Sequence, residues 1–313
     1  MAQEEKYIRF DWAMKRLLRD KANYAVLEGL LTTLLGEKIT INHLLESESN
    51  QEDEYDKYNR VDMLAEDSHG QLVIIEIQNN TEYAYFQRML FGVSKLITEY
   101  INRGNGYEKI RKIYSVNIVY FDLGNGKDYV YHGTTEFRGI HNGDILNLSP
   151  FQMERFKATT VSQLYPEYYI LKVNDFNRVA KTPLEEWIYY LHTGIIPDDA
   201  NAPGLDQARK QLQLRRMSRD ELNAYYRHLD NIVILRDNVN TSREEGRWEG
   251  LAEGRAEGRA EGRAEGRAEG RAEEKARALE EKKAMVRSLK ASGVDPGIIA
   301  SASGLSIDEI AKL

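Results

Sequence analysis

The stretch RVDMLAEDSHGQLVIIEIQ, residues 60–78, decides the fold class of this chain. Two strand-like segments, Arg60–Glu66 and Gln71–Gln78, flank Asp67–Gly70, whose residue types favour a tight turn. The second segment is almost continuously apolar, which is typical of a strand that is buried on both faces. The stretch therefore predicts a β-hairpin in the core of the protein.

Each strand of this hairpin carries a carboxylate among apolar neighbours, Asp62 and Glu76. If residues 68–70 form the loop with Gly70 in the left-handed conformation, the residue numbers on each rung add up to 138, and Asp62 faces Glu76. Opposed residues have Cβ atoms about 4.5–5.5 Å apart. Two carboxylates that close repel each other unless one is protonated or a cation lies between them. A hard divalent cation such as Mg²⁺ suits this position, and the two-residue period places Gln78 on the same face as Glu76.

The segments around the hairpin predict a small sheet with helices against it. Helical spacing indicates helices over residues 11–35, ending at Gly36, and over residues 81–102, ending at residues 104–106. The acidic residues 46–58 are typical of a solvated loop. Strands are predicted at residues 113–121 and 129–132, with an Asn-Gly pair between them that favours a hairpin. The order helix, two strands, helix, two strands indicates an α/β or α+β fold around a mixed sheet, with residues 1–150 as its domain.

Composition excludes several classes of protein. The 313 residues are 42% apolar, which is enough for a sizeable core and suggests roughly two domains. The absence of cysteine excludes disulfides, thiolate zinc sites, iron–sulfur clusters and a cysteine nucleophile. No apolar run of about 18 residues and no secretory signal pattern is present, so we expect a cytoplasmic protein with no membrane partner. Because the net charge is −7, any contact with nucleic acid must come from a local basic patch.

The remainder of the chain is predicted to be mainly helical. Residues 151–242 have aromatic-rich helical stretches and indicate a cap or extension packed on the first domain. Residues 275–313 contain short helices, with Asp295-Pro296 as a helix start and Ser306 with Glu309 as a capping box. We expect this last segment to form a short helical hairpin that serves packing or oligomerisation more than DNA recognition.

Residues 243–274 form a low-complexity segment in which Gly-Arg-Ala-Glu occurs five times in succession from Gly254 to Glu273. Each four-residue unit advances a helix by about 40°, so no apolar face persists and no heptad coiled coil is expected. Glycine at every fourth position costs about 1 kcal/mol per repeat relative to alanine, and glutamates four residues apart repel. The segment is predicted to be a linker that is weakly helical or disordered; an ordered self-association element is the alternative.

The motif Asp62 … Glu76-Ile77-Gln78 resembles that of the PD-(D/E)XK nuclease superfamily, in which an acidic residue on one strand precedes E-x-K on the next. Gln78 stands where that superfamily usually has lysine. Longer segments resemble the recombination-promoting nuclease (Rpn) family, also described as PD-(D/E)XK family transposases, in which E-x-Q is the usual form. They are KYNRVDMLAED, VIIEIQ, YFQRMLFG and YPEYYILKVNDF. FDWAMKRLL resembles the family's opening helix and retains Asp11 and Lys15, with Met14 in place of phenylalanine. The resemblance extends over nearly the whole chain.

This resemblance implies a restriction-endonuclease-like core and a Mg²⁺-dependent DNA endonuclease that acts in recombination or in mobile elements. It implies Asp62, Glu76 and Gln78 as catalytic residues, and Asp62, Glu76 and the backbone carbonyl near Ile77 as metal ligands, with Mn²⁺ as an alternative ion. DNA is the implied partner, and the C-terminal repeat and helices offer a route to a homo-oligomer. Because the amide of Gln78 carries no charge, some other cation or a second metal must stabilise the transition state. Arg88 is the best candidate for this role and for a phosphate contact.

Ordinary structural roles compete with these assignments. Asp62 is also compatible with a turn residue at a strand end, Glu76 with a buried ion pair to Arg88, and Gln78 with a residue that only satisfies backbone groups. The supporting candidates also have simple alternatives: a helix-surface residue for Arg88, a helix N-cap for Asp11 and a solvated side chain for Lys15. Two other functions therefore stay open, a non-catalytic binding or regulatory protein on a nuclease fold, and an RNA nuclease.

Overall fold

The computed structural model describes residues 6–16, 18–45, 62–101 and 106–313. The chain divides into two compact units, Met1–Arg236 and Asp237–Leu313. The first predicted boundary, at residue 150, falls inside the first unit. Within the described residues, no helix has the length and apolar character needed to cross a membrane.

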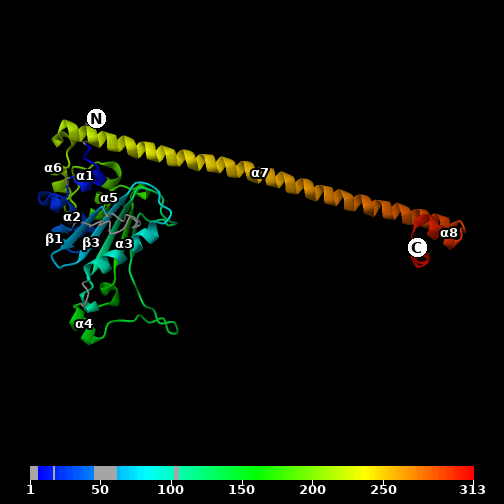
Figure 1. The fold of residues 1–313 in the computed structure, drawn as a ribbon, viewed down its shortest axis with the longest axis horizontal. Helices are drawn as coiled ribbons and strands as arrows, with labels where there is room; N and C mark the ends of the chain where they lie inside the picture. The colour runs from blue at the N-terminus through cyan, green and yellow to red at the C-terminus, as the bar shows by residue number, and fades with distance from the viewer. Residues whose placement is uncertain (1–5, 17, 46–61, 102–105) are drawn as a thin grey trace. The chain divides into compact units, whose positions relative to one another are not determined.

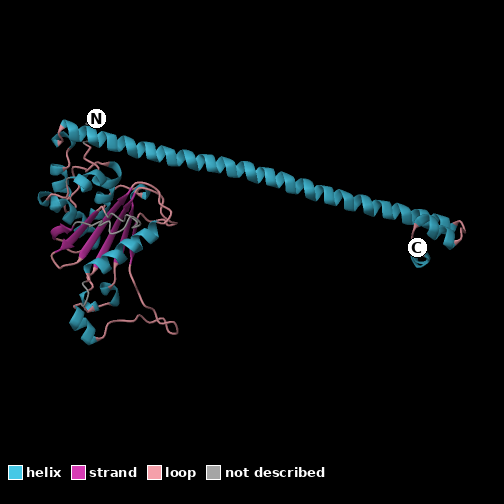
Figure 2. Ribbon diagram, in the orientation of Figure 1, coloured by secondary structure: helices cyan, strands magenta, loops and turns pink. Residues whose placement is uncertain are grey.

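A mixed sheet forms the centre of the first unit (Figure 2). In the described residues its strands are β1 (Ile41–Leu45), β2 (Met63–Asp67), β3 (Leu72–Gln78), β4 (Ile113–Val119), β5 (Val130–Gly133) and β6 (Glu167–Lys172). They lie in the order β1-β2-β3-β4-β6-β5. The pairs β3–β4 and β4–β6 are parallel, and the outer pairs are antiparallel. A mixed sheet with helices on both faces confirms the predicted fold class.

Helices cover both faces of this sheet because alternate strand residues are apolar on both sides. One face packs against α1 (Phe10–Arg16), α2 (Tyr24–Leu35), α5 (Pro183–Thr193) and α6 (Leu205–Gln211). The other face is covered by α3 (Tyr85–Tyr100) (Figure 1). Val93 and Leu96 of this helix pack against the sheet. The strand β3 is buried along almost its whole length, as predicted for a strand with two covered faces. The short helix α4 (Pro150–Phe156) precedes β6.

The hairpin at residues 63–78 has the predicted register. Met63 pairs with Ile75 and Glu66 pairs with Leu72, so that the residue numbers on each rung add up to 138. Gly70 has φ +77° in a loop in which its own N–H donates to the carbonyl of Asp67. Turn chemistry and strand periodicity therefore fix this register from local sequence alone.

Three predictions of secondary structure are corrected. The predicted helix over residues 11–35 is interrupted, because α1 ends at Arg16. A 3₁₀ turn precedes α2, and Asp20 caps this turn by accepting a hydrogen bond from the N–H of Ala22. Gly36, at φ +74°, ends α2 as predicted. The Asn-Gly turn at residues 122–127 does not join a hairpin, because β5 pairs with β6 instead of β4. The helical prediction for residues 151–242 is wrong at β6, and β1 was not predicted.

Two predicted features lie outside the described residues. One is the acidic loop at residues 46–58. The other is the helix stop at residues 104–106, of which only Gly106 is described.

The helix α7 (Arg219–Ala291) begins in the first unit and extends into the second. It contains the whole of the Gly-Arg-Ala-Glu segment, in which every residue is exposed and every glycine has open space around it. The structure places this segment, which the sequence predicts to be weakly helical or disordered, in a helix. The capped starts of α8 (Pro296–Ser303) and α9 (Ile307–Lys312) are confirmed, since Asp295 and Ser306 accept hydrogen bonds from the first-turn N–H groups. These helices bury Ile299 and Ile310 against Val286.

Candidate active site

Asp62 lies directly before β2, where the backbone pairing of β2 with β3 ends. Extending the observed register by one rung places Asp62 opposite Glu76, as predicted. A carboxylate oxygen of Asp62 accepts a hydrogen bond of 2.7 Å from the N–H of Ile77. The ammonium of Lys15, in the last turn of α1, is 3.4 Å from its other oxygen. Asp62 is thus tied to the strand that carries Glu76.

The backbone of Ile77 faces the same carboxylate. The N–H and C=O of one strand residue point to the same side of the strand, so the carbonyl of Ile77 also points toward the β2 side. The backbone carbonyl of the neighbouring Gln78 points to the opposite side of the strand, toward β4. It accepts a 2.9 Å hydrogen bond from the N–H of Tyr120, which directly follows β4. The carbonyl that the family resemblance implies as a metal ligand therefore lies on the Asp62 side of β3.

Glu76 is a buried carboxylate with an unsatisfied oxygen. Its side chain is 8% exposed, and its Oε2 atom has no hydrogen-bond partner among the described residues. The Nε atom of Arg88, from α3, lies 3.5 Å from that oxygen, but it also makes no hydrogen bond. Burial raises the pKa of Glu76 to about 7; the cation of Arg88 opposes this rise, and the charge of Asp62 adds to it. A buried oxygen of this kind suits a cation that approaches closely.

Arg88 lies between two carboxylates. Its guanidinium donates a 3.0 Å hydrogen bond to Glu82 in addition to its ion pair with Glu76, and its side chain is 30% exposed. The ion pair with Glu76, one of the ordinary roles expected from the sequence, is therefore present. The exposed part of the guanidinium can still donate to a phosphate oxygen.

Gln78 is the last residue of β3 and is half-buried. The alternation along the strand puts its side chain on the same face as Glu76. Among the described residues its amide makes no hydrogen bond, so both its donor and its acceptor are available to a ligand.

Asp11 occupies a different place from the carboxylate pair. It is 1% exposed in the first turn of α1, which begins at Phe10, so Asp11 is not the helix N-cap. Its oxygens accept hydrogen bonds from Arg9, from the amide of Asn79 (3.0 Å) and from the N–H of Trp12 (2.9 Å), and His228 of α7 lies 3.0 Å away. Burial alone would raise the pKa of Asp11, but His228 and Arg9 outweigh it and hold the pKa well below its usual range.

Asn79, the residue that follows Gln78, joins this second cluster to the end of β3. Sequence reasoning missed Arg9, Asn79 and His228. His228 is 217 positions from Asp11, so no local pattern connects them.

A buried polar row behind Glu76 was also missed. Asn117 pairs with Glu76 across the β3–β4 ladder and accepts a 3.3 Å hydrogen bond from the hydroxyl of Tyr85. Its amide donates to Ser115 and to the carbonyl of Tyr169. Burial, followed by the charge of Glu76, raises the pKa of Tyr85 and keeps its hydroxyl protonated. The signal in the sequence was a polar Asn inside the apolar strand IYSVNIVYF.

The residues present fit a divalent ion in part. Two carboxylates and one backbone carbonyl converge at the end of β3, and one carboxylate oxygen is buried without a hydrogen bond. Hard ions such as Mg²⁺ are held by few carboxylates, and waters and phosphate oxygens complete their shell. No group of three His, Cys, Asp or Glu side chains suited to a metal occurs in the part of the chain that the structure describes.

The comparison with protein families agrees with this geometry. A family model described as "PD-(D/E)XK nuclease family transposase" matches residues 8–240. The chain belongs to this family, which confirms the resemblance seen in the sequence. Searches of the curated proteins and of the solved structures each gave no significant match.

Proposed function

We propose that this protein is a Mg²⁺-dependent DNA endonuclease that acts in recombination or in the movement of mobile elements. The observation that carries the proposal is the buried Oε2 atom of Glu76, the residue opposite Asp62 in the extended register, which has no hydrogen-bond partner among the described residues. Membership of a nuclease family supports the same function.

Asp62, Glu76 and the carbonyl of Ile77 would hold the ion, and Mn²⁺ would be an alternative to Mg²⁺. When bound, the ion supplies charge stabilisation to the scissile phosphate and acidity to a water molecule. The hydrogen bond from Ile77 holds Asp62 in position, which reduces the conformational entropy that binding must remove. The raised pKa of Glu76 means that ion binding requires loss of a proton from its carboxyl near neutral pH.

Three further side chains have roles in this proposal. The free amide of Gln78 orients the attacking water or a phosphate oxygen by hydrogen bonding. Arg88 supplies the positive charge that Gln78 lacks and contacts the phosphate. Lys15 stays close to Asp62 and lowers the electrostatic cost of bringing a phosphate to two carboxylates.

The test is nicking of supercoiled plasmid by the full chain with Mg²⁺, with Ca²⁺ and with EDTA. Glu76→Gln should lose at least 100-fold in nicking rate, because it keeps the shape of the side chain and removes its charge. Glu99→Gln is the matched control, since Glu99 is an exposed residue of α3 that pairs with Lys95. Equal nicking by wild type and Glu76→Gln, or none by wild type with a folded chain, would remove the proposal.

A non-catalytic binding or regulatory protein is the alternative. The observation that favours it is that Arg88 and Lys15 already lie beside Glu76 and Asp62, as in a purely structural ion-pair network. The absence of Mg²⁺-dependent nicking, together with DNA binding that survives Glu76→Gln, would support it. Structured RNA, assayed beside the plasmid, distinguishes an RNA nuclease. A cytoplasmic location and a homo-oligomer formed through the C-terminal helices stay predictions.

A further inference from the structure

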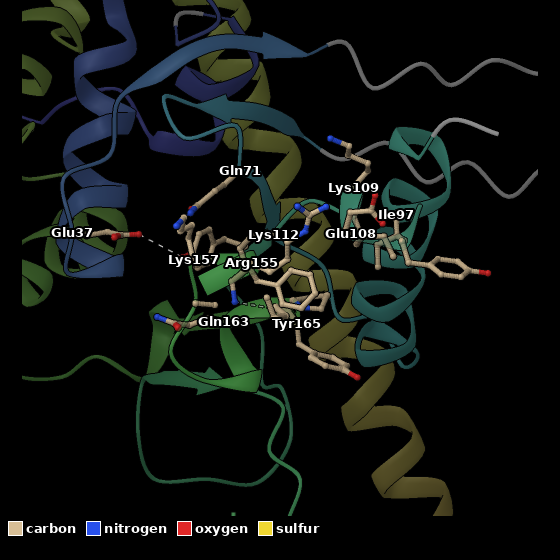
Figure 3. Close-up of a pocket in the computed structure, with 17 residues that line it drawn as sticks. Glu37, Gln71, Ile97, Glu108, Lys109, Lys112, Arg155, Lys157, Gln163 and Tyr165 are labelled. Carbon is tan, nitrogen blue, oxygen red and sulfur yellow. Dashed lines mark hydrogen bonds between the residues drawn. The ribbon is translucent and has the colours of Figure 1, made fainter. Parts of the chain in front are cut away.

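A pocket lies at the opposite end of the sheet from the carboxylate pair. It has a volume of about 900 Å³ and is lined by the starts of β3 and β4 and by the segment between α4 and β6 (Figure 3). Gln71, at the start of β3, is five residues before Glu76, which corresponds to about 17 Å along a strand. The pocket is therefore separate from the candidate active site.

Unpaired cations line this pocket. Lys109, Arg155 and Lys157 are exposed, and within the described residues none of them forms an ion pair. In Figure 3, Arg155 and Lys157 lie in the middle of the pocket and Lys109 lies at one side. Lys157 has φ +54°, in the left-handed region that residues with a side chain rarely adopt. Clustered cations of this kind suit phosphate groups.

One wall of the pocket, formed by the residues directly before β6, is held in place. The ammonium of Lys112 donates to the carbonyls of Ser162 and Tyr165 and to the carboxylate of Glu167, over distances of 2.6 to 3.1 Å. This triple contact fastens the segment before β6 to the start of β4. The pocket therefore has a fixed side rather than a loose loop, and it is preorganised for a ligand.

Two acceptors lie together at the other side of the pocket. Within the part of the chain that the structure describes, Gln71 has a buried Oε1 atom without a hydrogen-bond partner, and the carboxylate of Glu37 lies beside it in Figure 3. A buried acceptor without a partner indicates a missing donor. The amino groups of nucleobases are donors of this kind.

Aromatic side chains complete the lining. Tyr107 is 86% exposed and Tyr165 is 39% exposed, and both line the pocket. Such rings provide platforms on which nucleobases stack without sequence preference. Cations, ring faces and the buried Oε1 atom of Gln71 together match the three parts of a nucleotide unit: its phosphate, the face of its base and the edge of its base.

We propose that this pocket binds the nucleotide units of a single-stranded nucleic acid, apart from the site of cleavage. Phosphates contact Arg155, Lys157 and Lys109, a base stacks on Tyr107, and its amino edge donates to Gln71. The overall charge of −7 makes such a local patch necessary for contact with any polyanion.

The experiment measures fluorescence anisotropy of labelled hexadeoxyadenylate with the full chain carrying Glu76→Gln, in EDTA, so that cleavage and ion bridging do not contribute. Adding Arg155→Gln with Lys157→Gln should weaken binding at least tenfold and lower the salt slope by about 1.4, as for two phosphate contacts to a single strand. Tyr107→Ala should weaken binding about tenfold. Lys181→Gln with Lys210→Gln, which are exposed lysines outside the pocket, is the matched control and should bind unchanged.

Competition by free deoxyadenosine monophosphate distinguishes the two sources of this chemistry. Displacement of the hexamer at similar concentrations of nucleotide would mean that a free nucleotide is sufficient, and displacement only by a longer strand would mean that a nucleic acid is the ligand. Binding by the Arg155/Lys157 variant that equals the control would overturn the proposal. It would also be overturned if Arg88→Gln abolished binding and the pocket variant did not, because the strand would then occupy the candidate active site. The proposal does not depend on nicking, so the two can fail separately.

Discussion

The backbone N–H of Ile77 donates a 2.7 Å hydrogen bond to the carboxylate of Asp62, at the point where the β2–β3 ladder runs out. This bond joins the two strands that carry the candidate metal ligands, on the side of β3 to which the carbonyl of Ile77 also points. It gives Asp62 a structural role that can be separated from any role in catalysis.

Asp62→Asn and Asp62→Ala should separate these roles. Asparagine retains an oxygen that can accept from Ile77, so its free energy of unfolding should stay within about 1 kcal/mol of wild type; alanine leaves the N–H without its partner and should lose about 1–2 kcal/mol. Urea unfolding measures both values. Both variants should lose Mg²⁺-dependent nicking. Wild-type nicking by the folded asparagine variant would show that the charge of Asp62 has no part in the reaction.

Glu76 should make the stability of the first unit depend on pH. Its pKa is about 7 in the folded state against 4.5 in the unfolded chain, so the folded state retains a proton between these values that the unfolded state has released. Stability should therefore fall as pH rises from about 4.5 to about 7, by up to about 3 kcal/mol. Glu76→Gln should remove this loss and be more stable than wild type at pH 8. Urea unfolding of the two proteins from pH 5 to pH 8 measures this. The same change in the free energy of unfolding with pH in both proteins would contradict the prediction.

Divalent ions should stabilise the folded chain through the same carboxylate. At pH 8, Mg²⁺ at ten times its dissociation constant should add about 1.4 kcal/mol to the free energy of unfolding. Addition of EDTA should reverse this gain. Thermal unfolding with and without Mg²⁺ measures it in wild type, Glu76→Gln and Glu99→Gln. A gain in Glu76→Gln as large as that in wild type would place the ion elsewhere.

Asp11 should matter for stability more than for chemistry. Asp11→Asn leaves the cations of the cluster without their buried carboxylate and should cost about 3 kcal/mol. Because the pKa of Asp11 is held below its usual value, its contribution is present above about pH 4 and is lost at lower pH. Asp206→Asn is the control, because the side chain of Asp206 is 70% exposed and forms an ion pair with Arg209. This substitution should lower the free energy of unfolding by less than about 1 kcal/mol. Chemical unfolding at pH 7 compares them.

Two glycines in helices should respond in opposite ways to alanine. At Gly29 of α2, a Cβ atom would lie 2.3 Å from the backbone of Pro203 and Gly204, so Gly29→Ala should destabilise the first unit by about 3 kcal/mol. At Gly262 of the repeat a Cβ meets nothing within 4 Å, so Gly262→Ala should raise helix stability by about 1 kcal/mol. Circular dichroism and urea unfolding record both effects. A neutral Gly29→Ala would mean that α2 and α6 separate easily.

The local features of the fold could be predicted from the sequence. The register of the β2–β3 hairpin follows from Ser68-His69-Gly70 and from strand periodicity, and the caps at Asp295 and Ser306 follow from residues within one helical turn. The site residues Asp62, Ile77 and Glu76 come together for the same reason, since they belong to one hairpin.

The features that were missed depend on residues far apart in the sequence. Glu167–Lys172 is a short run of aromatic and aliphatic residues, whose periodicity does not tell a strand from a helix until its neighbours are known. The partners of Asp11 come from separate parts of the chain, and only the folded chain brings Asn79 and His228 to it.

The position of β6 has a consequence for the order in which the chain can fold. The strand β6 enters between β4 and β5, although both of these precede it in the chain. Until the ribosome has released residue 172, β5 has no strand to pair with. One edge of β4, the strand that contains the fully buried Val116 and Ile118, also stays unpaired. A nascent or truncated chain that stops at residue 150 therefore presents a bare strand edge, which favours aggregation. The sheet can be completed only after β6 has paired with both β4 and β5. Because this pairing joins residues far apart in the sequence, refolding of the full chain should be slow.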